Sequence, residues 1–201
     1  MLAGVRRGDT IVEVLFAVTV FSLVAVGSLS IMNQGTSASM RAIETTIVRQ
    51  EIDAQAETLR FLHDAYIGDV TPEAGTPAAQ WQLTVEDIGT DLPSTFGVID
   101  NKCPTPPTGS FVMNARTATY VGNPSLLQPA QTFAQVVYRD DATLESAQGI
   151  WIEGVRSQIS ADPQENTAGY VDFHIRACWD APGSAVPMTL GTIVRLYEPR
   201  G

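Results

Sequence analysis

The chain has 201 residues, of which 44% are hydrophobic and 17% charged, a composition typical of one or two folded domains and not of a disordered chain. Its 22 acidic and 12 basic residues give a net charge of -10, and the basic residues are scattered, which argues against binding to nucleic acid. Two cysteines and two histidines are too few and too far apart for a structural zinc site.

The first predicted element is an apolar helix near the N-terminus. The 22 residues from Ile11 to Met32 contain one charged side chain, Glu13. As a helix they would be about 33 Å long, enough to cross a bilayer core of about 30 Å. Arg6 and Arg7 precede this segment, so the positive-inside rule places the N-terminus in the cytoplasm and the remaining chain outside. A cleaved secretory signal and a plain single-pass anchor are the alternatives, but neither explains a carboxylate in this segment.

The residues from Gly8 to Leu15, GDTIVEVL, resemble the prepilin motif of type IV pilins and pseudopilins. The resemblance implies that residues 1–8 are a leader removed by a prepilin peptidase between Gly8 and Asp9, and that the new N-terminus at Asp9 is methylated. It also implies that Glu13, the fifth residue of the mature chain, meets the N-terminal amine of a neighbouring subunit during assembly. Asp9 stands where the family usually has an apolar residue, and this departure weakens the implied methylation more than the implied cleavage.

The motif also makes physical sense. Gly8 has no side chain, so the backbone around it can lie close to a protease. Cleavage would free an amine at Asp9, the natural partner for the Glu13 carboxylate in a low-dielectric setting. The alternative is that Glu13 only reaches up to the membrane interface.

The helical pattern continues beyond the membrane segment. The chain has no proline between Thr10 and Thr71, which predicts one helix from Thr10 to Tyr66 that Gly68 and Pro72 bring to an end. We expect residues 9–32 to be the membrane and filament-core half of this helix and residues 33–67 the amphipathic half. An apolar stripe at helical spacing marks the second half as the spine of the head: Met40, Ile43, Ile47, Ile52, Ala56, Leu59, Leu62 and Tyr66.

Residues 68–201 are predicted to form a globular, β-rich head. Residues 68–80 read as a linker, and the segments with β-type patterns are 81–85, 111–113, 132–138, 150–153, 171–179 and 192–197. Proline- and glycine-rich loops are expected at 104–109, 123–129 and 181–187. The predicted fold class is therefore α+β, a long N-terminal helix packed on a C-terminal antiparallel sheet.

Cys103 and Cys178, the two cysteines, are 75 residues apart. A disulfide between them is reasonable in an exported head, and the frequent occurrence of a disulfide near the C-terminus of pilins adds weight. The alternative is two separate buried thiols. Cys178 lies in phase with His174 and Arg176 on the polar face of its strand, which favours a bridge at the surface or at an edge.

Signals for catalysis or ligand binding are weak. Asp172, His174 and Arg176 share one strand face and could hold an acid–base pair, but a solvated face is the better interpretation. His63 lies near the end of the long helix, where a cation suits the helix dipole. No motif of a known enzyme class is present, so no enzymatic activity is predicted.

Two further groups of residues are candidate ligand sites. Asp140, Asp141 and Glu145 could bind calcium, but their spacing is typical of a solvated turn. Trp81, Trp151 and Trp179 could form a sugar-stacking face, but tryptophans in strands more often belong to the core. No cofactor and no metal ion are predicted.

These observations favour a structural subunit of a type IV pilus or of a related secretion or competence pseudopilus, and the head favours a minor pilin over an abundant one. The expected partners are other pilin subunits, the prepilin peptidase, the pilus assembly platform and the cytoplasmic membrane, with no nucleic acid. The chain would be a single-pass membrane protein before assembly and part of an extracellular filament afterwards. The alternative is a membrane-anchored ectodomain with a binding role, such as glycan recognition or adhesion, or an enzymatic role.

Overall fold

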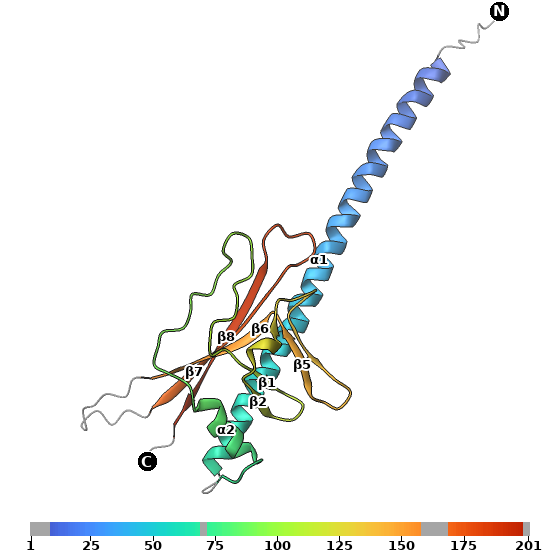
Figure 1. The fold of residues 1–201 in the computed structure, drawn as a ribbon. Helices are drawn as coiled ribbons and strands as arrows, with labels where there is room; N and C mark the ends of the chain where they lie inside the picture. Colours follow the sequence, from blue (N-terminus) through green and yellow to red (C-terminus); the bar gives the residue numbers. More distant parts are fainter. Residues whose placement is uncertain (1–8, 69–71, 158–168, 199–201) are drawn as a thin grey trace, which may run out of the picture. The chain divides into compact units, whose positions relative to one another are not determined.

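The structure is a computed structural model that describes residues 9–68, 72–157 and 169–198 (Figure 1). The chain divides into two compact units, Met1–Ala42 and Ile43–Gly201. Helix α1, Asp9–Gly68, contributes residues to both units. The predicted helix from Thr10 to Tyr66 is therefore confirmed to within two residues at each end, as expected for a stretch without proline.

The second unit is built on the part of α1 from Ile43 onward. One face of this segment is buried, and its members recur at three- and four-residue intervals: Val48, Ile52, Gln55, Ala56, Leu59 and Leu62. The predicted stripe is right from Ile52 to Leu62 but wrong at Ile43, which is 59% exposed. At about 100° per residue, Ile43 lies about 140° around the helix from Val48. Met40, also predicted as part of the stripe, is exposed and belongs to the first unit.

Helix α2, Pro77–Val85, corrects two predictions, the linker at residues 68–80 and the β-type segment at residues 81–85. The side-chain oxygen of Thr76 accepts a hydrogen bond from the backbone N–H of Ala79, and Pro77 occupies the first helical turn. Both are favourable helix-start features. Trp81 and Thr84 are buried three residues apart on one face, so the apparent alternation of this short segment belongs to a helix.

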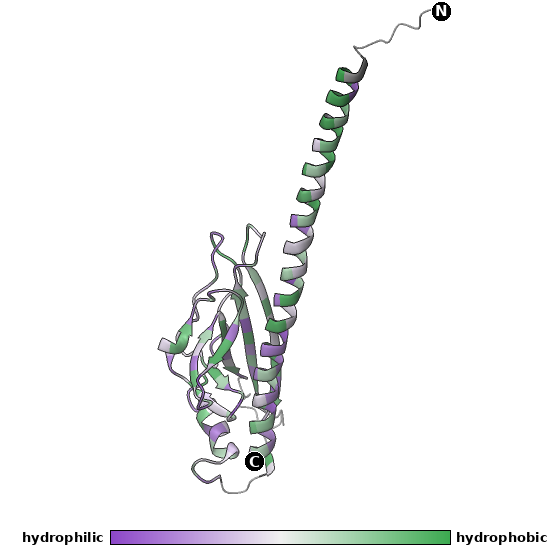
Figure 2. Ribbon diagram, turned by 90° about the vertical axis from the view of Figure 1, so that its right-hand side faces the viewer, coloured by the Kyte–Doolittle hydropathy of each residue, from purple (hydrophilic) through white to green (hydrophobic). Residues whose placement is uncertain are grey.

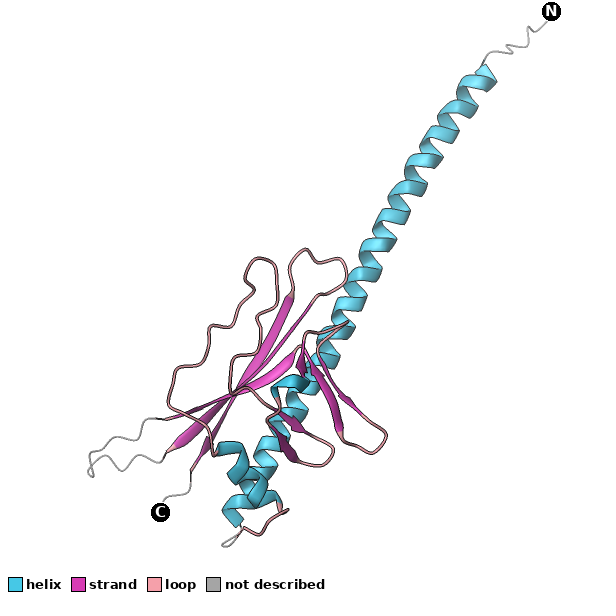
Figure 3. Ribbon diagram, viewed as in Figure 1, coloured by secondary structure: helices cyan, strands magenta, loops and turns pink. Residues whose placement is uncertain are grey.

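The main sheet is antiparallel, with strand order β6-β7-β8 (Figure 3). Its strands are β6, Ile150–Arg156, β7, Tyr170–Trp179, and β8, Met188–Tyr197. All three were predicted, although β8 begins four residues earlier than expected. The inner face packs into the core formed with α1, and β7 contributes Val171, Phe173, Ile175, Ala177 and Trp179, each at most 1% exposed.

Two smaller sheets complete the second unit. Strands β1, Val112–Asn114, and β2, Thr119–Val121, form an antiparallel pair. The other sheet has the order β3-β5-β4, with the strands Leu127–Gln128, Leu144–Gln148 and Gln135–Tyr138. The β3–β5 pair is parallel, and the 3-10 helix Pro124–Leu126 (η1) precedes it, so the segment predicted as a loop at 123–129 contains two short elements.

A buried polar side chain ties α1 to the first small sheet. The amide of Gln55 donates to the carbonyl of Met113 at 2.9 Å and accepts from its backbone N–H at 2.7 Å. Gln55 is fully buried, so both of its hydrogen bonds are made without competition from water.

All three tryptophans are buried, as the sequence favoured: Trp81 and Trp179 belong to the core cluster, and Trp151 lies on the opposite face of the main sheet. Trp81, Trp151 and Trp179 are 3%, 2% and 1% exposed, so they form no accessible stacking face. The ring of Trp81 packs edge-on against Phe173, with 5.7 Å between their centroids. The Trp179 indole N–H reaches the Glu44 carboxylate at 3.1 Å, which satisfies its single donor.

Candidate functional site

The proposed processing and assembly motif is at the start of α1. Gly8 lies outside the described residues, and α1 begins at the next residue, Asp9. Glu13 is exposed and follows within the first turns of the helix, where the dipole favours a negative charge. In the part of the chain that the structure describes, Glu13 has no hydrogen bond and no ion pair, so its carboxylate is available to another molecule.

The segment after Glu13 is apolar around its whole circumference. Its large side chains are exposed, for example Phe16 at 71%, Phe21 at 73% and Ile31 at 73%. This part of α1 is predominantly hydrophobic in Figure 2, and an 18-residue window reaches a mean hydropathy of 2.4 with none of its residues buried. A helix that is apolar on all sides is typical of a membrane span, and this one is long enough to be a single span.

Three of the four hydroxyl groups in this segment are satisfied by the helix itself. Thr19, Ser22 and Ser28 each donate to the carbonyl four residues earlier, at 2.7, 2.7 and 2.8 Å. Internal satisfaction of polar groups is what a hydrocarbon environment requires. Apart from the Glu13 carboxylate, the segment therefore presents little polarity to its surroundings.

In the second unit, the loop of residues 86–110 crosses the outer face of the main sheet (Figure 3). It follows α2, passes the edge of β6 where Arg156 N–H donates to the Gly89 carbonyl at 2.8 Å, and returns to β1. Phe96 on this loop packs edge-on against Trp151, with 5.9 Å between the centroids. The loop therefore covers the outer face of the sheet over β6 and part of β7, whereas Ile193 and Tyr197 on β8 remain exposed. No local pattern in the sequence indicated this cover.

A polar cluster of Ser94, Glu153 and Arg176 holds this loop on the sheet. The Glu153 carboxylate accepts from the Ser94 N–H at 3.0 Å and from its hydroxyl at 2.7 Å. Arg176 Nη1 lies 2.8 Å from both Glu153 Oε1 and Ser94 Oγ. The side chains of Arg176 and Glu153 are only 7% and 9% exposed, so this is a buried ion pair. Both charges are paired and hydrogen-bonded, so the cluster is suited to a structural role that attaches the loop to the sheet.

This cluster corrects the prediction of a solvated strand face at Asp172, His174 and Arg176. Arg176 is buried under the loop, and His174 is half-buried. Burial, and then the positive charge of Arg176, lower the pKa of His174. Asp172 is paired with Arg195 on β8 through hydrogen bonds of 2.8 and 2.7 Å, and these lower the pKa of its carboxyl group.

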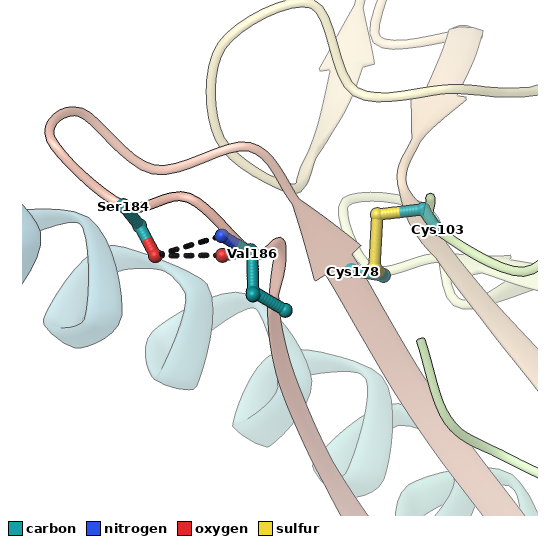
Figure 4. The surroundings of a disulfide bond; sticks show 4 residues. All are labelled: Cys103, Cys178, Ser184 and Val186. Atoms are coloured by element: carbon teal, nitrogen blue, oxygen red, sulfur yellow. Dashed lines mark hydrogen bonds between the residues drawn. A yellow bond between two sulfur atoms is a disulfide. The ribbon is translucent and has the colours of Figure 1, made fainter. Parts of the chain in front are cut away.

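The predicted disulfide joins Cys103 on the loop to Cys178 on β7, as Figure 4 shows. The expectation that it lies at the surface is wrong on the strand side, because Cys178 is fully buried. The reason is the same loop, which covers the part of the polar face of β7 that carries Arg176 and Cys178. The disulfide and the polar cluster thus attach the loop at two places. The neighbouring turn is closed separately by Ser184 Oγ, which donates to the Val186 carbonyl at 2.7 Å.

The remaining candidate residues have structural roles. The Nε2–H of His63 donates to the Tyr197 carbonyl at 2.8 Å, and its ring packs edge-on against Trp81. Asp141 lies in the turn between β4 and β5 and accepts from the hydroxyl and the N–H of Thr143, which lowers the pKa of its carboxyl group. Across residues 9–68, 72–157 and 169–198, no three potential metal ligands come together.

Sequence reasoning missed Ser94, Glu153 and Gln55. A signal was present for Glu153, because a carboxylate in the middle of a largely apolar strand needs a partner, and Arg176 carries the opposite charge in another strand. Ser94 and Gln55 carry no comparable signal, since serine and glutamine are ordinary surface residues.

Comparison with known proteins gives no match: no protein-family model fits the chain, and neither the curated proteins nor the solved structures contain a significant relative. What the structure itself shows is a protein of the α+β class, with a long N-terminal helix whose first part is apolar enough to span a membrane.

Proposed function

We propose that the chain is a pilin-like subunit, most consistent with a minor pilin, of a type IV pilus or of a related secretion or competence pseudopilus. The observation that carries this proposal is the position of Glu13. It is the one charge in a 22-residue apolar segment, and it follows Gly8 by five residues. A simple anchor has no use for this charge, whereas a filament subunit can pair it with the amine of its neighbour.

The proposed sequence of events follows from the chemistry of that segment. A prepilin peptidase removes residues 1–8, and the freed amine at Asp9 is positively charged near neutral pH. The helix is then extracted from the membrane into the filament core, where Glu13 meets the amine of an adjacent subunit. The satisfied hydroxyls and the apolar surface of α1 support packing in either environment, and the disulfide supports an oxidising destination for the head.

The proposal is tested by Glu13→Ala. This variant keeps Gly8 and the leader charges, so we expect normal cleavage, and it removes a charge from lipid, so the membrane level should not fall. Incorporation into sheared surface filaments, measured relative to the membrane pool, should drop. Glu57→Ala is the matched control, because Glu57 is an exposed carboxylate on the same helix that pairs with Arg60.

An unchanged sheared fraction for Glu13→Ala would mean that the carboxylate has no part in assembly. The alternative of a membrane-anchored ectodomain would then be favoured. If Glu57→Ala reduced the sheared fraction as much as Glu13→Ala, the effect would be one of general charge and the specific role of Glu13 would be lost.

A further inference from the structure

The main sheet ends at β8, and the outward side of this strand has no partner strand. The order β6-β7-β8 places β8 at one edge, and its pairing with β7 runs over ten consecutive residues, Met188–Tyr197. Just beyond the strand, the N–H of Glu198 donates to the Gly169 carbonyl at 2.8 Å. Because hydrogen-bonded pairs alternate in an antiparallel ladder, the even-numbered residues of β8 bond to β7. The N–H and C=O groups of the odd-numbered residues therefore point away from the sheet.

These outward backbone groups are open to solvent over most of the strand. Gly191, Ile193 and Arg195 are exposed, and Ile193 is 60% exposed. Within the described part of the chain, no residue forms a hydrogen bond with the backbone N–H or C=O of these three residues. The end of the strand is occupied, since the Tyr197 carbonyl accepts a hydrogen bond of 2.8 Å from a histidine of α1. The open stretch, residues 189–195, is called the β8 edge below.

The opposite edge of the same sheet is covered by the chain itself. Ile152 on β6 exchanges two backbone hydrogen bonds with Phe111, at 2.8 and 3.0 Å, and the N–H of Arg156 donates to the Gly89 carbonyl. Native proteins protect a sheet edge by such cover, or by proline, lysine or a β-bulge in the edge strand. β8 contains no proline and no lysine, and its register with β7 is continuous. An unprotected edge strand of ten residues is a template for a strand from another chain.

The β8 edge carries no net charge. Arg195, the one charged residue of β8, donates to both carboxylate oxygens of Asp172 at 2.8 and 2.7 Å, and its guanidinium lies 3.9 Å from the centre of the Tyr170 ring. A basic segment would find no free carboxylate on β8, and an acidic one would be repelled by the net charge of -10. An uncharged segment therefore fits best, with a β-branched or aromatic residue opposite Ile193.

A second copy of the chain does not fit this edge. Glu44 on α1 contacts Trp179, which pairs with the first residue of β8, and His63 on α1 contacts Tyr197, its last residue. The part of α1 in the second unit therefore runs in the same direction as β8. Two β8 strands paired about a twofold axis normal to the sheet are antiparallel, which would reverse one helix relative to the other. Two chains with their N-termini in one membrane cannot pair in this way, and the covered β6 edge excludes a head-to-tail arrangement.

We propose that the β8 edge binds an extended, uncharged segment of a different protein chain, which adds to the main sheet as a further strand. The backbone groups of Gly191, Ile193 and Arg195 would form the hydrogen bonds, and the Ile193 side chain would supply the apolar contact. In this mode of recognition, main-chain hydrogen bonds give affinity and alternate side chains give specificity. The proposal is independent of the filament assignment, because every group involved belongs to the second unit.

The test is amide hydrogen exchange of the full chain, resolved to single residues by fragmentation mass spectrometry. It compares intact cell envelopes of the chain's own host with the purified chain in detergent. The amides of Gly191, Ile193 and Arg195 should exchange about tenfold more slowly in the envelopes, because a bound strand would protect them. The amides of Thr192 and Val194, which bond to β7, are internal references and should be equally slow in both samples.

Ile193→Lys keeps every backbone group of the strand but places a charge on its apolar position. Since the side chain is largely exposed, the Tm should not change, whereas the envelope-specific protection of Gly191 and Arg195 should be lost. Leu83→Lys is the matched control, because Leu83 is an apolar residue of α2 that is 49% exposed, and this variant should keep the protection.

Equal exchange of the outward amides in envelopes and in detergent would overturn the proposal. Protection that is already present in the purified chain at high concentration would assign the edge to a second copy, and the proposal of a different chain would be wrong. Loss of protection in Leu83→Lys to the same degree as in Ile193→Lys would also contradict a site at the β8 edge.

Discussion

The buried ion pair between Arg176 and Glu153 offers a quantitative test of how the outer loop is held. Arg176→Met keeps a long side chain on β7 but leaves the Glu153 carboxylate buried without its cation. Both side chains are less than a tenth exposed, at 7% and 9%. Removal of one partner from such a pair costs about 3–5 kcal/mol of unfolding free energy. Equilibrium urea unfolding of the full chain in detergent, followed by tryptophan fluorescence, measures this change.

The matched control and a double variant separate the pair from other effects. Arg195→Met removes an arginine with similarly short bonds to Asp172, but the Arg195 side chain is 47% exposed, so the loss should be much smaller. Glu153→Gln keeps an acceptor for the Ser94 N–H, and combined with Arg176→Met it leaves no buried charge. We expect the double variant to be more stable than the sum of the single effects by about 2 kcal/mol. If Arg176→Met and Glu153→Gln each lowered the unfolding free energy by less than about 1 kcal/mol, and their effects simply added, the interpretation as a buried ion pair would be refuted.

Three further predictions follow from the second unit. Replacement of both Cys103 and Cys178 by serine should lower the unfolding free energy by about 4 kcal/mol, because the disulfide closes a 75-residue loop. In the parent chain isolated from its own host, alkylation under denaturing, non-reducing conditions should detect no free thiol. Burial raises the pKa of Glu51, because it disfavours the charged carboxylate in the folded chain. The stability of the chain is therefore highest with respect to this group below its unfolded-state pKa, and it falls as the pH rises through its folded-state pKa. Glu51→Gln should therefore stabilise the chain at pH 7 more than at pH 4 in thermal unfolding, and equal shifts at both pH values would contradict this. Gly149→Ala should destabilise by more than about 1 kcal/mol in urea unfolding, because Gly149 has φ +64° and a Cβ would collide with the Cys178 carbonyl oxygen; an unchanged midpoint would contradict this.

Local signals predicted the long elements well. The absence of proline up to Thr71 and the Gly68 stop fixed α1, and alternation over nine residues fixed β7, because these features act within one element. The error at residues 77–85 has a local cause as well. The apparent alternation of residues 81–85 favours a strand, whereas Thr76 and Pro77 are helix-start signals, and the structure follows the latter.

The contacts that the sequence could not predict are long-range. Ser94 and Arg176 are separated by 82 residues, and Gln55 and Met113 by 58. Such pairs depend on the path of a loop over a sheet, which has no periodic pattern. The burial of Cys178 follows from that path, so the pairing of the cysteines could be anticipated but their environment could not.

The pilin assignment is tested most directly by the N-terminus of the mature chain. Mass spectrometry of the protein isolated from the membranes of its own host should find a chain that begins at Asp9. Gly8→Val should abolish this product and leave residues 1–8 attached, because the peptidase site needs a minimal side chain. A parent chain that retains its leader, or a Gly8→Val variant cut at Asp9, would contradict the prepilin assignment.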